Sequence, residues 1–436
     1  MKGFEMLQSC IDNHVSILEE ELVCALGCTE PIAVAYASAL ARAALGEVPG
    51  HLSVACSGNI IKNVKSVTVP NSGGMRGIEA AATLGAVGGD EARALEVLEA
   101  ITDEHRAVTS RLLDNSYCSV ELAEGVPNLY VRAIATGGTH VAVACIEERH
   151  TNVTELTRDG EPVEVAGVRA HASRGEVEGG EEPHATLSLE SIWEFAHTLD
   201  VEDVRKVIEN QLRLNEEISI EGLTGNWGAR IGKTLLATRP HDISCGARAL
   251  AAAGSDARMS GCAMPVVINS GSGNQGITCS MPVLAYAREL EKPQDELIRA
   301  TVLSNLVSVH VKYFIGELSA FCGAVSAGAG AGAGICYLRG GSFAQFEATI
   351  VNTLANVGGI VCDGAKPSCA AKISAAVDAA ILGCDMALAD DNFLAGEGLV
   401  GTNAEETIRS MGYVGRVGMH PTDVEILNIM IGKTEV

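Results

Sequence analysis

Two cysteines, Cys362 and Cys369, lie close together in the segment GGIVCDGAKPSCAAKIS. The Gly, Asp-Gly and Lys-Pro residues between and around them prevent a regular helix, so one tight loop can present both thiols. Thiolates are ligands for zinc and iron, and a metal needs them to converge at about 2.3 Å. The spacing therefore indicates a pair of metal ligands, with two unrelated core cysteines as the alternative.

A third candidate ligand, Cys322, precedes a run of small residues in ELSAFCGAVSAGAGAGAGIC. Small residues let the backbone approach a bulky cofactor closely, but they also simply let helices touch. Cys336 ends the same run and is a rival candidate. Spacing alone does not decide between these two cysteines.

Cys28, in the segment ALGCTEP, lies between Gly27 and Pro31, which predict a helix break with an exposed thiol. If a helix begins again at Pro31, its N-terminal amides favour the thiolate and lower the pKa of the thiol. Cys28 is then a candidate base or nucleophile, and a structural cysteine is the alternative. Cys24, one turn earlier, is more typical of packing.

The run INSGSGNQGIT at 268–278 contains three glycines that satisfy the G-x-G-x-x-G pattern of dinucleotide-binding folds. The pattern is followed by more helix, however, and the second strand of a βαβ unit is missing from the sequence. We interpret the run as a glycine-rich nest that holds a substrate carboxylate. Its hydrogen bonds would come from Ser272, Asn274 and Gln275.

Two further polar loops contain candidate substrate-binding residues. The first, SGNIIKN at 57–63, contains Asn59 and Lys62, and the second, RHTN at 149–152, contains His150 and Asn152. A cation such as Lys62 would help this acidic chain to hold an anionic substrate. For each loop, a solvated surface or a satisfied core position is the alternative.

Helical and strand patterns divide the chain unequally. Residues 1–45 have helical spacing on both sides of the break near Cys28, residues 51–70 have short β-branched runs around a Gly-Asn turn, and residues 128–163 alternate like an antiparallel meander. After residue 188 helical patterns dominate, and PVVIN at 265–269 is the clearest strand. The sequence predicts an α+β fold, with antiparallel strands in the N-terminal half and a mainly α-helical C-terminal half that carries the cysteine site.

A chain of 436 residues predicts two domains. The polar, acidic, glycine-rich stretch 173–184 is the predicted linker, so the predicted domains are 1–185 and 186–436. The uncharged run 318–338 has the length of a membrane span, but it is mostly Ala and Gly. This composition favours a buried helix pair or a loop between helices.

The formal net charge of -24 argues against nucleic acids and anionic membranes as partners. The N-terminal segment MKGFEMLQSCIDNHVSILEEEL has neither the apolar stretch nor the cleavage site of a secretory signal. We therefore expect a cytoplasmic protein, in which the 14 cysteines remain free thiols.

Six segments, in order along the chain, together resemble the L-cysteine desulfidases, also described as serine dehydratase alpha-like proteins: GCTEP, SGNIIKN, RHTN, SGSGNQGI, SAFCGA and VCDGAKPSC. The resemblance implies an oxygen-sensitive [4Fe–4S] cluster held by only three cysteines, Cys322, Cys362 and Cys369. It further implies that Cys28 is the base that abstracts a proton. Pyridoxal phosphate is not required.

The implied reaction is β-elimination of a small amino acid, which converts L-cysteine to pyruvate, ammonia and hydrogen sulfide. An iron without a protein ligand would act as the Lewis acid. Some serine dehydratase relatives use a C-terminal cysteine at the cluster, whereas this chain ends IMIGKTEV. The difference favours a desulfidase and leaves L-serine open.

The alternatives are a non-catalytic iron–sulfur binding protein and, ranked lowest, a nicotinamide-dependent oxidoreductase based on the G-x-G-x-x-G pattern. If the chain associates, a homodimer is the expected assembly.

Overall fold

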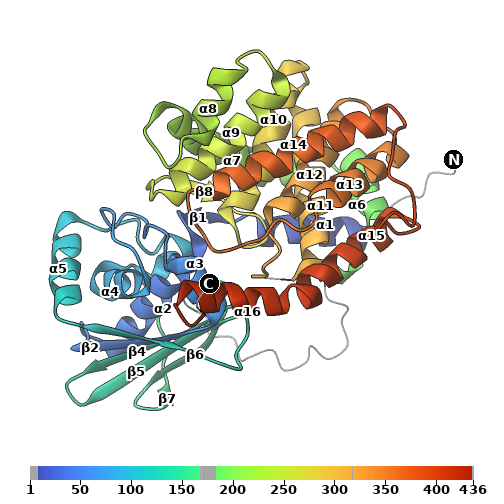
Figure 1. Ribbon diagram of the computed structural model, residues 1–436. Coiled ribbons are helices and arrows are strands. Elements are labelled where there is room, and N and C mark those ends of the chain that lie inside the picture. The colour runs from blue at the N-terminus through green and yellow to red at the C-terminus, as the bar shows by residue number, and fades with distance from the viewer. Residues whose placement is uncertain (1–7, 167, 169–182, 317, 435–436) are drawn as a thin grey trace.

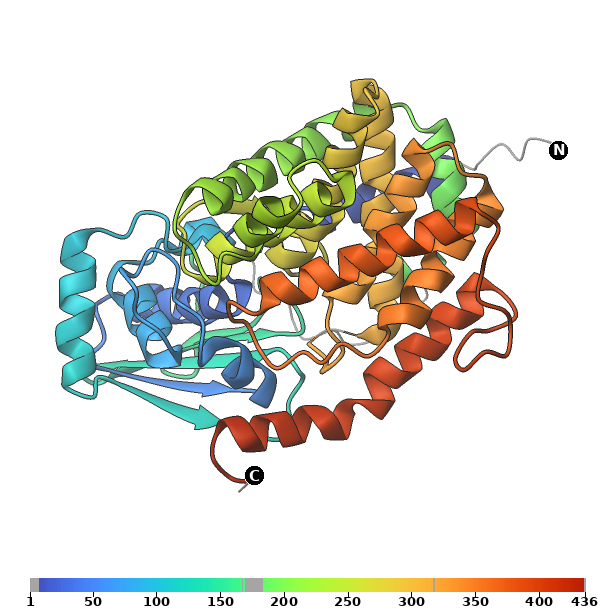
Figure 2. The same cartoon turned by 45° about the horizontal axis from the view of Figure 1, so that its top comes forward.

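The computed structural model describes residues 8–166, 168, 183–316 and 318–434. A twisted sheet covered by helices forms one part of the molecule, and a larger bundle of helices forms the other (Figures 1 and 2). The sheet comes from the N-terminal region and the bundle mainly from residues beyond 188. The predicted α+β fold class is therefore confirmed.

The sheet has six strands in the order β3-β2-β4-β5-β6-β7, and only the β2–β3 pair is parallel. The predicted meander at 128–163 is confirmed as the run β4 to β7. Helix α2 (Thr29–Leu45) packs directly on β4 and β5, and α4 (Ile78–Gly88) packs on α2 (Figure 1). The strand bounds are β2 (His51–Cys56), β3 (Cys118–Leu122), β4 (Tyr130–Gly137), β5 (His140–Glu147), β6 (Val153–Arg158) and β7 (Glu161–Pro162).

The prediction of a turn between strands at 51–70 is wrong, because the SGNIIKN segment is helical. Ser57 caps helix α3 (Gly58–Val64), and its side chain accepts a hydrogen bond from the Ile60 amide. Serine at an N-cap satisfies a free helix amide, so Gly-Asn here starts a helix and does not turn a hairpin. Asn59 and Lys62 consequently lie on a short, mostly buried helix.

The second half of the chain is a bundle built around helix α12 (Ala324–Leu338), which contacts α10, α11, α13 and α14. The uncharged run 318–338 therefore contains part of the loop between α11 and α12, followed by the buried helix α12 itself. The predicted buried helix pair is wrong, and the predicted loop between helices describes only the first residues of the run. Along the described part of the chain, no helix has both the length and the apolar character needed to cross a bilayer. The other helices of this half are α6 (Leu189–Thr198), α7 (Glu202–Thr224), α8 (Ile231–Thr238), α9 (Ile243–Met259), α10 (Gly273–Glu289), α11 (Gln294–Ile315), α13 (Phe343–Val357), α14 (Cys369–Leu388), α15 (Ala404–Tyr413) and α16 (His420–Met430).

Three chain segments connect the two parts. Strand β1 (Cys24–Leu26) pairs antiparallel with β8 (Pro265–Val267), which is the predicted PVVIN strand. Helix α1 (Gln8–Glu21) packs on α7, and α16 returns to α3 (Figures 1 and 2). Residues 173–182 of the predicted linker lie outside the described residues, and the boundary at residue 185 stays a prediction.

The third glycine of the G-x-G-x-x-G pattern has a packing role. Gly276 lies in the first turn of α10, where an added Cβ would overlap the carbonyl oxygen of Val267 in β8. Strand β8 pairs antiparallel with β1, so the pattern is not part of a parallel βαβ unit. Gly276 instead lets α10 cross β8 closely enough to bring its N-terminus to the interior.

We expect Gly276→Ala to lower the free energy of unfolding by about 1–3 kcal/mol, because the added methyl group forces backbone apart in a packed core. Gly246→Ala is the matched control, since a Cβ at this helical glycine of α9 meets no atom within 4 Å. It is expected to be neutral or stabilising by up to about 1 kcal/mol. Urea unfolding midpoints compare the two variants, and equal midpoints would contradict this packing role.

Candidate active site

A cavity of about 280 Å³ lies where the N-terminal part meets the helical bundle. Its wall includes the start of α2, the end of α9, the start of α10 and the loops before α12 and α14. The volume is near the lower end of ligand-binding pockets, which suits a small metabolite. Eight of the predicted site residues line it: Cys28, His150, Ser272, Asn274, Gln275, Cys322, Cys362 and Cys369.

The loops that carry Cys322 and Cys362 are hydrogen-bonded to each other. The Cys322 amide donates to the Ile360 carbonyl at 2.9 Å, and the Cys362 amide donates to the Ala320 carbonyl at 2.6 Å. Phe321 and Val361, which precede Cys322 and Cys362, pair with each other in an isolated antiparallel β-bridge. This pairing places two cysteines separated by forty positions side by side, and their thiols hydrogen-bond to each other.

Cys369 joins this pair from the first position of α14. The loop before it bends sharply at Gly364, whose φ is +91°, and the Cys369 thiol lies 3.7 Å from the Gly364 carbonyl oxygen. A negative charge on Cys369 raises the pKa of Cys322, and a negative charge on Cys362 raises the pKa of Cys369, so the three thiols lie near one another. The bent loop predicted between Cys362 and Cys369 is therefore present, and three thiols face the same cavity.

The three thiols differ in acidity. The hydrogen bond between Cys322 and Cys362 lowers the pKa of Cys362 and raises that of Cys322, while burial raises the pKa of Cys369. The cationic side chains of Lys62 and Lys372 also lower the pKa of Cys362. A negative charge shared by the Cys322 and Cys362 pair is therefore favoured by the neighbouring ammonium groups of Lys62 and Lys372.

The donor set suits an iron–sulfur cluster better than a single ion. Within the described residues, no group of three or more His, Cys, Asp or Glu side chains is placed to hold one metal ion. In a cluster, each cysteine binds a different iron, so the sulfurs need not meet around one point. All three candidate donors are thiols on partly exposed cysteines of the cavity wall, which is the ligand type that clusters use.

Cys28 lies at the N-cap of α2, so the predicted restart of a helix is confirmed. The prediction of an exposed thiol is wrong, because Cys28 is 2% exposed, and the residues just before it form strand β1 rather than a helix. The predicted lowering of its pKa is wrong: burial, followed by the charge of Glu30, raises the pKa of Cys28 well above its ordinary value. The thiol donates a hydrogen bond to Glu30 Oε2 at 3.1 Å and packs among Val67 and Met259. The Glu30 carboxylate and the apolar surroundings raise the pKa of Cys28 by more than the amides at the start of α2 lower it.

Glu30 is a residue of the cavity wall that the sequence analysis did not select. It accepts hydrogen bonds from Cys28, Thr29 and Asn63, each at 3.1 Å. Burial raises the pKa of Glu30, but His150, the Cys28 thiol and the guanidinium of Arg258 together hold it below its ordinary value. The site therefore contains a partly buried, ionised carboxylate in direct contact with the Cys28 thiol.

The glycine-rich run forms the turn before α10 and the first residues of that helix. Ser272 is the N-cap residue of α10, although its side chain makes no capping hydrogen bond. Gln275 accepts a hydrogen bond from Ser326 at 3.1 Å, and an added Cβ at Gly323 would lie 2.7 Å from its carboxamide carbon. Gln275 thus supports the loop next to Cys322, while Asn274 remains on the cavity wall.

Three predicted substrate-binding residues do not line the cavity: Asn59, Lys62 and Asn152. Asn152 donates to the Glu147 carbonyl at 3.0 Å and closes the turn after β5. The rival ligand Cys336 is buried on α12, where its thiol is hydrogen-bonded to Cys384, and it does not line the cavity. The structure therefore separates Cys336 from the other three cysteines.

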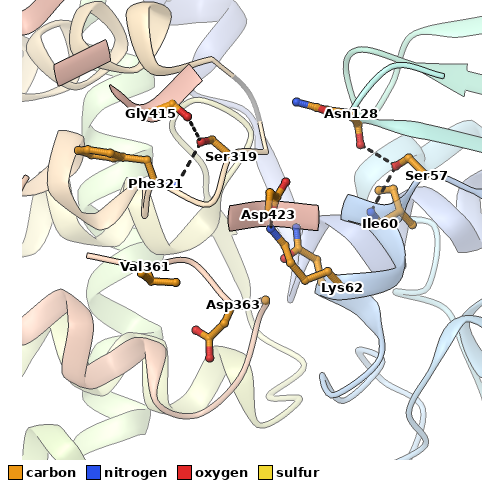
Figure 3. A network of polar contacts seen from close by, with 12 residues as sticks. Ser57, Ile60, Lys62, Asn128, Ser319, Phe321, Val361, Asp363, Gly415 and Asp423 are labelled. Carbon is orange, nitrogen blue, oxygen red and sulfur yellow. Dashed lines mark hydrogen bonds and ion pairs between the residues drawn. The ribbon is translucent and has the colours of Figure 1, made fainter. Parts of the chain in front are cut away.

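Lys62 contacts the C-terminal segment at the edge of the site. Its ammonium group is paired with Asp423 of α16, and its side chain is 1% exposed. Ser319, in the loop before Cys322, donates to the Gly415 carbonyl at 2.8 Å. Figure 3 shows Asp423 between the loops of Ser319 and Asp363 on one side and Lys62 on the other. The C-terminal segment therefore holds together the elements that surround the cysteines.

We expect Asp423→Asn to lower the free energy of unfolding by about 3 kcal/mol, because the buried ammonium of Lys62 loses its counter-charge. Glu425→Gln, at an exposed position of the same helix, is the matched control and should change stability by less than about 0.5 kcal/mol. Thermal unfolding of both variants measures the difference. Equal losses in the two variants would show that the Lys62 pair contributes nothing.

A family profile described as serine dehydratase alpha chain matches residues 92–428. A UPF0597 protein of Finegoldia magna is 49% identical over 422 residues, which cover 97% of this chain and 100% of the relative. UPF0597 proteins of Lachnoclostridium phytofermentans and Fusobacterium nucleatum are 45% and 41% identical, covering 96% and 97% of this chain and 99% and 100% of the relatives.

The chain therefore belongs to the serine dehydratase alpha chain family, and the predicted resemblance is confirmed. This membership supports an enzyme of the lyase, dehydratase type. The name UPF0597 identifies no substrate.

Proposed function

We propose that this protein is a [4Fe–4S]-dependent lyase that converts L-cysteine to pyruvate, ammonia and hydrogen sulfide. One observation carries the proposal: Cys28 and the thiols of Cys322, Cys362 and Cys369 share the wall of a single small cavity. All 14 cysteines are free, which suits the reducing cytoplasm that the proposal assumes.

Cys322, Cys362 and Cys369 would hold the cluster. When bound, the cluster would supply a Lewis-acidic iron that polarises the β-sulfur of the substrate as a leaving group. The hydrogen-bonded pairing of the Cys322 and Cys362 loops fixes the direction of two of these thiols before any ligand arrives.

Cys28 and Glu30 would act as a pair in proton transfer. A free thiolate at Cys28 is disfavoured, because burial and the Glu30 charge both raise its pKa. Cys28 therefore takes the Cα proton while its own thiol proton moves to Glu30 along their hydrogen bond. The pair carries one negative charge before this step and none after it, so no second charge is buried.

The electrons of the broken Cα–H bond form the Cα–Cβ double bond, and the β-sulfur leaves as hydrosulfide. The released aminoacrylate becomes an imine, which water converts to pyruvate and ammonia. The family description favours L-serine as the second candidate substrate, with water as the product in place of sulfide.

Anaerobic turnover tests the proposal. The protein is reconstituted with iron and sulfide, and the release of pyruvate and sulfide from L-cysteine is compared with the release of pyruvate from L-serine. The proposal predicts a brown protein that is more active on L-cysteine. A protein without a cluster that is equally active would contradict it, and preference for L-serine would assign the second candidate.

A further inference from the structure

Three buried polar atoms of the cavity wall have no hydrogen-bond partner. They are Arg258 Nη2, Asn274 Oδ1 and His150 Nε2. More than nine in ten buried polar groups are normally paired, because an unpaired one loses its hydration without compensation. A donor and an acceptor left open on the same small cavity point to a ligand that supplies the missing partners.

The guanidinium of Arg258 is held rigidly with one edge free. Arg258 is 2% exposed at the end of α9, and its Nε donates to the Gly27 carbonyl at 2.8 Å. An added Cβ at Gly273 would overlap this guanidinium, so the absence of a side chain at Gly273 leaves space for the guanidinium. The second glycine of the G-x-G-x-x-G pattern is thereby explained.

The charges that face Arg258 leave its free N–H available. Glu30 is the nearby carboxylate, but it accepts its hydrogen bonds from Cys28, Thr29 and Asn63. Burial, opposed by Glu30 and assisted by Arg258, lowers the pKa of His150, so this ring is neutral at pH 7. Arg258 is therefore a fixed cation in this part of the wall, and its Nη2 has an N–H group without an acceptor.

We propose that Arg258 binds the α-carboxylate of the substrate through Nη2, and that Asn274 Oδ1 accepts a hydrogen bond from its α-ammonium group. This inference rests on the proposed function and specifies the substrate as an α-amino-acid zwitterion. Arginine suits the task because its planar, permanently charged fork matches the geometry of a carboxylate. Asn274 follows Gly273 directly, so the acceptor lies one residue from the glycine that accommodates the guanidinium.

Two analogues of L-cysteine separate the carboxylate from the ammonium group. Cysteamine keeps the thiol and the amine but lacks the carboxylate, and 3-mercaptopropionate keeps the thiol and the carboxylate but lacks the amine. Their dissociation constants are measured by calorimetry on the anaerobically reconstituted protein, so the readout does not depend on turnover. Wild type, Arg258→Ala and Arg248→Ala are compared.

Arg248 is the matched control because it lies on the same helix and pairs with Asp378 outside the cavity. Arg258→Ala should weaken 3-mercaptopropionate at least about 30-fold and change cysteamine by less than about threefold. Arg248→Ala should change neither. Equal weakening of both analogues by Arg258→Ala, or no weakening of 3-mercaptopropionate, would overturn the inference.

A folding defect is distinguished by chemical rescue. Added guanidinium ion should restore 3-mercaptopropionate binding to Arg258→Ala, because it refills the space between Gly27 and Gly273, and a misfolded site would not respond. The proposed function can fail without the inference. If the protein binds these ligands through Arg258 but never releases sulfide or pyruvate, the inference stands and the lyase function is excluded. If the protein turns over L-cysteine but Arg258→Ala binds both analogues as the wild type does, the lyase function stands and the inference is excluded.

Discussion

Replacing Cys28 by Ala is expected to abolish turnover of L-cysteine while the iron–sulfur cluster remains bound. The three candidate ligands lie in the loop before α12, in the loop before α14 and at the first position of α14, whereas Cys28 comes from the start of α2. The variant therefore removes the proton acceptor without removing a thiolate ligand. Loss of a positioned base costs about 10²- to 10⁴-fold in kcat.

Glu30→Gln should lower kcat within the same range, because glutamine keeps the shape but no longer accepts the thiol proton. Cys56→Ala is the control, since Cys56 is equally buried but lies in strand β2 and does not line the cavity. It should retain wild-type kcat. Anaerobic kinetics and the visible absorption of the cluster are measured on all three variants. Full activity in Cys28→Ala would exclude Cys28 as the base.

Replacing Cys362 by Ala is expected to remove both the cluster and the activity. The loop of Cys362 is hydrogen-bonded to that of Cys322, and Cys362 shares the cavity wall with Cys322 and Cys369, so its loss removes one of the three candidate ligands. Two remaining cysteines would hold a cluster poorly. Iron and acid-labile sulfide per chain should fall to near zero after anaerobic reconstitution.

Cys336→Ala is the matched control for this prediction, because Cys336 is the rival ligand by spacing. Its thiol is buried against Cys384 and outside the cavity wall, so this variant should keep its cluster. A cluster retained in Cys362→Ala but lost in Cys336→Ala would reverse the assignment of ligands.

The local patterns of the sequence predicted much of the fold. The alternation at 128–163 became β4 to β7, and PVVIN became β8. The error at residues 57–63 arose because Gly-Asn was weighed as a turn, while the serine before it supplied a helix cap. Both signals occur in this short segment, and packing of α3 under α16 favours the helix.

The cavity is formed by contacts between residues that are far apart in the sequence, and the spacing of the motifs does not predict such contacts. Thr29 donates to the Gly271 carbonyl at 2.9 Å, and Arg258 reaches the Gly27 carbonyl, although more than two hundred residues separate each pair. The family resemblance supplied the roles of Cys28 and the three ligand cysteines. Glu30 lies within the GCTEP segment, but only its contact with the Cys28 thiol in the structure led to its proposed role.

The pKa of Cys28 shows why local rules failed at this site. A helix N-terminus lowers the pKa of an exposed thiol, and the sequence contained the helix start. Burial among Val67 and Met259, and the proximity of the Glu30 charge, have the opposite and larger effect. The structure therefore disfavours a free thiolate at Cys28 and supports the proposal that the thiol and the Glu30 carboxylate act as a pair.

Mössbauer spectroscopy of protein reconstituted with ⁵⁷Fe tests most directly whether three thiolates leave one iron open to substrate. The account predicts that one iron of the cluster differs from the others, and that only its signal shifts when L-cysteine is added anaerobically. Four equivalent irons that do not respond to L-cysteine would contradict it.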